Sequence, residues 1–173
     1  SNGDALIENI NLQAAPGDSL LIQGASGCGK TSLLRALAGL WPFGVSGEIS
    51  APPQEDIMFV PQRPYVPQGS LREAVCYPDI DPQHPDLENA MRDCCMEKWL
   101  PYLDITDDWQ HRLSPGELQR IAFIRILLAR PRLVLLDEST AALDEPTEET
   151  LYQLLLKRLP DSTLVSIGHR CTL

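Results

Sequence analysis

Four short apolar runs alternate along the chain with longer stretches in which apolar side chains recur every three to four residues. The runs cover residues 20–23, 57–60, 133–136 and 163–167, and the helical patterns cover 30–40, 86–100, 116–130 and 146–159. Short continuous apolar runs are typical of buried strands, and their alternation with helices is typical of a largely parallel sheet. The pattern therefore predicts an α/β fold.

The stretch between the second and third runs has a different character. The helical segment at 86–100 carries one apolar stripe, and its members are Leu87, Ala90, Met91, Cys94 and Cys95. We expect a packed helix there, with both cysteines as buried thiols. Prolines recur at 78, 82, 85 and 101, and no strong strand pattern lies between 71 and 112. We therefore predict a small helical insert that starts near residue 71 and continues through a helix at 114–130.

Residues 24–31 match the G-x-x-x-x-G-K-[ST] pattern of phosphate-binding loops. A strand-like run precedes them and a helical pattern follows, which is the setting that this motif requires. Backbone N–H groups in such a loop face a phosphate chain, while the lysine reaches the β- and γ-phosphates and the hydroxyl binds Mg²⁺. The candidate nucleotide-binding residues are Gly24, Ala25, Ser26, Gly27, Cys28, Gly29, Lys30, Thr31 and Ser32. The sequence thus predicts binding of a nucleoside triphosphate.

A second motif is the apolar run at 133–136, which ends in Asp137 and Glu138. A strand of this type delivers Asp137 to the edge of the sheet, where its carboxylate can hold Mg²⁺ through water. Glu138 then lies beside the terminal phosphate, where it can take a proton from an attacking water molecule. Downstream of a phosphate-binding loop, this acidic pair indicates triphosphate hydrolysis.

A third motif resembles one known family. Residues 113–120 read Leu-Ser-Pro-Gly-Glu-Leu-Gln-Arg and resemble the LSGGQ-type signature of ATP-binding-cassette (ABC) ATPases. Gln62 resembles the glutamine of that family's Q-loop, residues 141–144 with Asp144 resemble its D-loop, and His169 resembles its switch histidine. The resemblance implies a single nucleotide-binding domain over 1–173, truncated at both ends. Its fold would be the P-loop NTPase (RecA-like) α/β fold, with a mostly parallel core, a small helical insert and a partial antiparallel β portion at the N-terminus.

The resemblance also implies the residue roles. ATP and Mg²⁺ would be the cofactors, and the catalytic residues would be Lys30, Gln62, Glu138 and His169. The metal site would be formed by Thr31, Gln62 and Asp137. Ser114, Gly116 and Glu117 would act in trans, on the γ-phosphate held by a second ABC domain. Pro115 and Glu117 depart from the usual signature, although Ser114 and Gly116 are retained.

Local features resemble one branch of the family, the fatty-acyl-type (D-subfamily, peroxisomal-like) half-transporters and bacterial SbmA/BacA-like proteins. These features are Leu40-Trp41-Pro42, Tyr77-Pro78 and Asp108-Trp109, while the segment 62–73 resembles the Q-loop region of membrane exporters of the family. The resemblance implies an exporter-type motor at the cytosolic face of a membrane, joined to a transmembrane domain of the same or another polypeptide. Two alternatives stay open: a soluble ABC ATPase without a transport function, and a fragment that binds nucleotide without efficient hydrolysis.

The composition of the chain limits the classes of partner that it can bind. The 173 residues carry a net charge of −10, with 43% hydrophobic and 22% charged residues. An acidic surface argues against a nucleic-acid partner, because phosphate backbones are held by clustered Lys and Arg. The apolar runs are too short to cross a bilayer, so we expect this piece to be soluble. Because the chain begins at Ser1, we expect an excised piece, whose adenine-stacking aromatic residue would lie upstream of residues 5–12.

Overall fold

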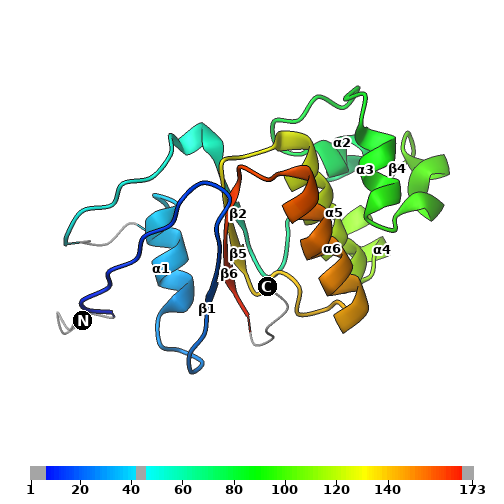
Figure 1. Ribbon diagram of the computed structural model, residues 1–173. Coiled ribbons are helices and arrows are strands. Elements are labelled where there is room, and N and C mark those ends of the chain that lie inside the picture. Colours follow the sequence, from blue (N-terminus) through cyan, green and yellow to red (C-terminus); the bar gives the residue numbers. More distant parts are fainter. Residues whose placement is uncertain (1–6, 42–45, 169–173) are drawn as a thin grey trace.

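The computed structural model describes residues 7–41 and 46–168, and its centre is a four-stranded parallel sheet (Figure 1). The strands are β1 (Ser19–Ile22), β2 (Ile57–Val60), β5 (Leu133–Asp137) and β6 (Thr163–Ile167), and their order in space is β1-β6-β5-β2. In the register, Leu20 pairs with Val165, and Leu135 pairs with both Val165 and Phe59. The predicted strand positions and the predicted parallel core are confirmed.

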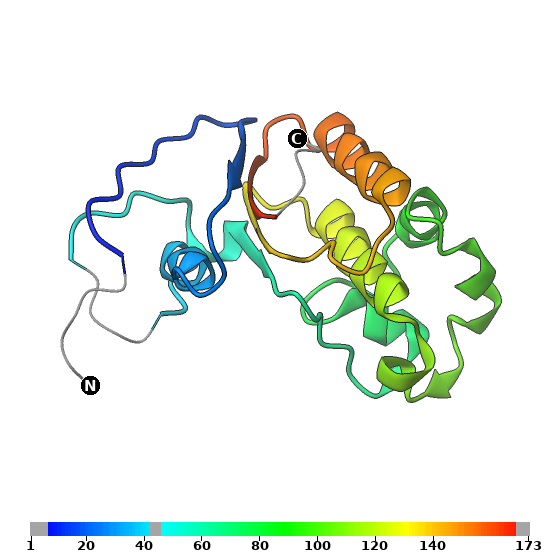
Figure 2. The same ribbon diagram turned by 90° about the horizontal axis from the view of Figure 1, so that it is seen from below.

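Helices cover both faces of the sheet (Figures 1 and 2). Helix α1 (Lys30–Leu37) covers one face, and α5 (Pro115–Ala129) and α6 (Glu145–Arg158) cover the other. Because successive strand residues point to opposite faces, Leu133 and Leu135 pack with α1, whereas Val134 and Leu136 belong to the larger core with α5 and α6. Burial on both faces explains why β5 is apolar at every position before Asp137.

The ends of the helices follow from local chemistry. Helix α1 stops at Leu37 rather than at the predicted residue 40, because Gly39 adopts a positive φ of 67° and the chain turns there. The Leu40 N–H donates to the Arg35 carbonyl over 2.8 Å, which closes this left-handed C-cap. Ser114 caps the start of α5, and Asp144 caps α6 by accepting from the Thr147 N–H over 2.8 Å.

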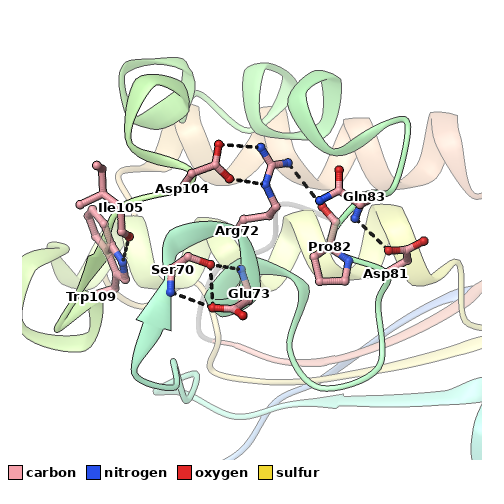
Figure 3. Close-up of polar contacts among 9 residues, drawn as sticks. All are labelled: Ser70, Arg72, Glu73, Asp81, Pro82, Gln83, Asp104, Ile105 and Trp109. Carbon is pink, nitrogen blue, oxygen red and sulfur yellow. Dashed lines mark hydrogen bonds and ion pairs between the residues drawn. The ribbon is translucent and has the colours of Figure 1, made fainter.

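The segment 71–112 is largely helical and packs beside α5, on the side of α5 and α6 away from α1 (Figure 1). It contains α2 (Leu71–Cys76), α3 (Leu87–Asp93), the 3₁₀ helix η2 (Glu97–Tyr102) and α4 (Trp109–Arg112). Arg72 ties these pieces together, since its guanidinium donates to Asp104 over 2.7 Å and to the Pro82 carbonyl over 3.4 Å (Figure 3). Ser70 and Glu73 form a capping box that fixes the start of α2 (Figure 3). We refer to 71–112 as the helical insert.

Two expectations for this region need correction. The helix expected over 86–100 ends at Asp93, because Cys95 turns the chain with a φ of 55° and the Met96 N–H donates to the Met91 carbonyl over 2.8 Å. The turn buries Cys94 as predicted but leaves Cys95 exposed, so the prediction of a buried thiol at Cys95 was wrong.

A small antiparallel sheet is present, but its position differs from the expected one. It joins β3 (Gly69–Ser70), directly before the helical insert, to β4 (Thr106–Asp107), near the end of the insert. The described N-terminal residues 7–18 contain no strand, and a short 3₁₀ helix, η1 (Gln54–Asp56), precedes β2. Over residues 7–41 and 46–168, the structure has no helix that is long and apolar enough to cross a membrane.

Candidate active site

Three of the predicted site segments converge at one edge of the parallel sheet. Gly24 lies two residues beyond β1, Gln62 lies two residues beyond β2, and Asp137 is the last residue of β5. The carboxyl ends of parallel strands meet at the same edge, so segments far apart in the sequence become neighbours there. This edge is the usual ligand site of open α/β sheets.

The phosphate-binding loop has the backbone that its glycines permit. Gly27 and Gly29 have φ values of 80° and 94°, a left-handed conformation that side chains rarely adopt, and α1 begins directly after Gly29. The Lys30 ammonium group folds back over the loop and donates to the carbonyls of Gly24 and Ala25 over 2.8 and 2.9 Å. A nearly buried cation is therefore held inside the curve of the loop, beside the N-terminus of a helix. This combination attracts anions.

Thr31 and Asp137 form the second part of the site. The Thr31 hydroxyl donates to a carboxylate oxygen of Asp137 over 2.9 Å, and Asp137 is buried at the end of β5. Hydroxyl and carboxylate oxygens are the hard ligands that Mg²⁺ prefers, and this ion usually keeps several waters beside one or two protein ligands. No cluster of three or more His, Cys, Asp or Glu side chains suited to a metal occurs among the described residues. The donor pair therefore suits Mg²⁺ with water and phosphate ligands.

Glu138 follows directly and has an unusual backbone. Its φ is 48°, and its N–H donates to the Ile167 carbonyl at the end of β6 over 3.1 Å. A left-handed conformation costs about 1 kcal/mol for a residue with a side chain. The Gln62 side-chain amide donates to the Glu138 carboxylate over 3.4 Å, so the structure brings these two predicted residues together.

The signature residues form the N-terminal turn of α5. The Ser114 hydroxyl accepts from the Glu117 N–H over 3.3 Å, and the Glu117 carboxylate accepts from the Ser114 N–H over 2.8 Å. The same carboxylate forms an ion pair with Lys98 at 2.7 Å and accepts from the Trp99 indole N–H at 2.8 Å. Burial alone would raise the pKa of the Glu117 carboxyl, but the hydrogen bonds from Lys98, Ser114 and Trp99 together lower it to about 2. Glu117 thus points into its own chain and fixes the backbone of Ser114.

Two further residues join this region and were missed by the sequence reasoning. Gln119 lies three residues after Gly116 on α5, and its side-chain amide contacts the backbone of both Gln62 and Ala142. Thr140 donates to the buried carboxylate of Glu148 over 2.6 Å, beneath the start of the D-loop. Spacing on the signature helix could have indicated Gln119. The partner of Thr140 depends on how α6 packs. His169 lies outside the described residues.

A strand that runs into a glycine-rich loop, a lysine and hydroxyl at the start of the next helix, and an acidic strand end define a P-loop nucleoside triphosphatase. The ABC transporter family model matches residues 7–141, and the chain belongs to this family. ABC transporters are ATPases, and membership of this family implies nucleotide binding by this domain.

Relatives agree with the branch inferred from the sequence. An uncharacterized ABC transporter ATP-binding protein of Haemophilus influenzae is 56% identical over 171 residues, which is 99% of this chain. ATP-binding cassette sub-family D member 3 of Homo sapiens is 35% identical over 99% of this chain. The chain spans 29% and 27% of the lengths of these two relatives. The solved structure of a bacterial Atm1-family ABC exporter with ATP bound has the same fold, with a TM-score of 0.82 at 22% identity over 98% of this chain and 33% of that one.

Proposed function

We propose that this domain binds ATP with Mg²⁺ and hydrolyses it to drive a membrane transporter of the exporter type. The observation that carries the proposal is the meeting of two side-chain pairs beside the phosphate-binding loop. Thr31 lies 2.9 Å from Asp137, and Gln62 lies 3.4 Å from Glu138. One pair offers hard oxygen ligands, and the other places an amide against a carboxylate that can accept a proton.

The loop would hold the phosphates of ATP through the backbone N–H groups of residues 24–32. Lys30 now donates to two loop carbonyls, and its ammonium group has a third hydrogen atom for a phosphate oxygen. Cys28 is exposed in this loop, and its backbone N–H, which donates to the Ala25 carbonyl over 3.4 Å, would turn to the phosphates. When bound by Thr31, Asp137 and Gln62, Mg²⁺ would neutralise the charge that develops on the β- and γ-phosphates.

Hydrolysis requires a base for the attacking water, and we assign this role to Glu138. Its carboxylate would take one proton as the water oxygen bonds to the γ-phosphorus and the bond to the β-phosphate oxygen breaks. Gln62 would orient the carboxylate through the hydrogen bond that the two already share. The left-handed backbone of Glu138 and the hydrogen bond from its N–H to the Ile167 carbonyl fix the point from which the Glu138 side chain extends. His169 would contact the γ-phosphate and hold the water.

A complete site would need a second copy of the domain or a similar partner domain. Ser114 and Gly116 lie at the N-terminus of a 15-residue helix, where a hydroxyl, backbone N–H groups and the helix dipole can face an anion. Glu117 would take part in trans by holding Ser114 in place. Asp144 would lie at the contact between the two domains, while its side chain caps α6. ATP would then close the pair head to tail, and hydrolysis would reopen it.

The relatives that carry transporter names support a role in transport. We therefore assign the domain to the cytosolic face of a membrane, next to a transmembrane domain of the same or a partner polypeptide. Movement would reach that domain through the Q-loop at Gln62 and the helical insert, because both pack on α5.

The test is ATP turnover by the 173-residue chain, measured in single-turnover mode at high protein concentration with Mg²⁺. We expect Glu138→Gln to lower the rate by about 100-fold or more, because loss of a general base has this order of effect. Glu149→Gln, which removes an exposed carboxylate from α6, is the control and should keep the wild-type rate. An unchanged rate in Glu138→Gln would overturn the assignment. ATP binding without turnover in the wild-type chain would favour a domain that binds nucleotide without hydrolysing it.

A further inference from the structure

One buried side chain joins two loops that the proposed function treats separately. The Gln119 amide nitrogen donates to the Gln62 carbonyl of the Q-loop over 3.3 Å. Its amide oxygen accepts from the Ala142 N–H of the D-loop over 2.9 Å. An amide is one of the few side-chain groups that can donate and accept at the same time through a single rigid plane.

Burial makes both bonds necessary. Gln119 is only 3% exposed, so its amide group depends on these two bonds while both loops lie on α5, although Gln62 and Ala142 are themselves exposed. A buried amide that loses one partner keeps an unsatisfied polar atom, which is unfavourable. If either the Q-loop or the D-loop moves away from α5, it therefore breaks a hydrogen bond with the same Gln119 side chain.

A second contact shows that the D-loop is seated on α5. A Cβ atom placed on Gly116 would lie 3.2 Å from the Ala142 carbonyl oxygen, so a glycine lets the two backbones approach this closely. Ala142 is therefore bonded to α5 at its N–H by Gln119, and its carbonyl lies close to Gly116. Both contacts come from the signature end of the helix.

The Q-loop and the chain that follows it are each held on the same helix. Gln119 holds the Gln62 carbonyl, and the guanidinium of Arg125 donates to the Tyr65 carbonyl over 2.9 Å. Ten of the fifteen residues of α5 are buried, so the helix is a rigid support. Gln62, whose backbone carbonyl is held by Gln119, is also the residue whose side chain contacts Glu138.

We propose that Gln119 is a positioning residue that couples the Q-loop to the D-loop. This inference rests on the proposed function, because it assigns Gln62 to the hydrolytic site and residues 141–144 to the contact with a second domain. A displacement of Gln62 is passed to Ala142 through one amide plane. The Q-loop, which contacts Glu138, and the D-loop, which would face the partner domain, then move together.

Two substitutions distinguish the contributions of the two Gln119 hydrogen bonds. Gln119→Glu keeps an acceptor for the Ala142 N–H but replaces the donor to Gln62 with a carboxylate that repels its carbonyl. Gln119→Met keeps the length of the side chain and removes both bonds. The control is Gln110→Met, since the Gln110 amide oxygen also accepts from a loop N–H, that of Val66 at 2.9 Å, but Gln110 is not the residue that bonds Gln62 and Ala142.

The first readout is amide hydrogen exchange without nucleotide, which does not depend on hydrolysis. We expect Gln119→Met to speed exchange about 10-fold or more in peptides that cover both 60–66 and 140–144. Gln119→Glu should speed exchange only in 60–66. Gln110→Met should leave the exchange rates of the D-loop peptide and of the phosphate-binding loop unchanged. Unchanged exchange of 140–144 in Gln119→Met would overturn the inference.

The second readout is steady-state ATP hydrolysis. We expect Gln119→Met to lower kcat about 10-fold or more while KM stays within about twofold, because misplaced groups reduce turnover more than binding. Wild-type kcat in Gln119→Met, or the same loss in Gln110→Met, would overturn the coupling role. If wild-type protein and Glu138→Gln hydrolyse ATP equally, the proposed function fails, and the exchange experiment still decides whether Gln119 joins the two loops.

Discussion

At the scale of single residues, the most informative side chain is Glu117. The usual signature has a glutamine there, and the resemblance to the family implied that Glu117 acts in trans. The structure turns its carboxylate inward, onto Lys98, Trp99 and the Ser114 N–H. Sequence reasoning could not find these partners, because Trp99 reaches Glu117 only through the packing of η2 against α5. What could be predicted was the capping box, since Ser114 and Glu117 have the required spacing.

The low pKa of Glu117 makes domain stability depend on pH. The folded-state pKa is about 2 against an ordinary value of 4.5, so the carboxylate stabilises the fold above pH 4.5 and loses this contribution as the pH falls towards 2. Trp99→Phe removes one of the bonds and should reduce this contribution by about 1 kcal/mol, with a shallower slope between pH 4.5 and 2.

Urea unfolding at several pH values measures that slope. Trp109→Phe is the matched control, since the Trp109 indole N–H donates to the Ile105 carbonyl rather than to a titrating group (Figure 3). Both substitutions lower stability, but only Trp99→Phe should change its dependence on pH. Equal acid slopes in Trp99→Phe and the wild type would contradict the role given to Trp99.

At the scale of elements, α5 organises the domain. Its residues 121–128 are all buried, and they include Arg125. The Arg125 guanidinium donates to the carbonyls of Tyr65, Ala74 and Val75 over 2.9, 2.6 and 3.2 Å. Burial lowers its pKa to about 10, which leaves it a cation at neutral pH. One side chain of α5 thus secures both the chain after the Q-loop and the end of α2.

Arg125→Met should lower the free energy of unfolding by about 3 kcal/mol, because three carbonyl groups lose their charged donor in a buried place. Arg132→Met is the control, since Arg132 is 64% exposed and lies 3.9 Å from Asp56, and exposed pairs of this kind contribute less than about 1 kcal/mol. Urea denaturation measures both values. A loss in Arg125→Met no larger than that in Arg132→Met would contradict the anchoring role.

The elements also show which parts of the fold the sequence could predict. The strands and the helices α5 and α6 follow local signals: continuous apolar runs, the cap at Ser114, and basic residues at the end of α6. The break of the helix at Cys95 has no glycine to mark it, and the two-residue strands β3 and β4 are too short to leave an apolar pattern. The contacts of Gln119 join three separate segments, so they depend on tertiary packing.

At the scale of the whole molecule, the candidate site lies along one edge of the sheet. The loop at 24–31, Gln62 and the end of β5 gather there, while the signature turn lies at the start of α5. The hydrogen bonds of Ser114 and Glu117 stay within α5 and the helical insert. The proposal that a second domain completes the site predicts that its two halves can be inactivated separately.

Mixing two inactive variants tests this central claim most directly. Lys30→Met damages the phosphate-binding half, and Ser114→Asp damages the signature half, because aspartate keeps the helix cap but repels the triphosphate. We expect each variant alone to be inactive. An equal mixture should recover about a quarter of the wild-type turnover, since half of the random dimers are mixed and each of these has one intact site. A mixture as inactive as its components, with active wild-type protein beside it, would contradict a site shared between two domains.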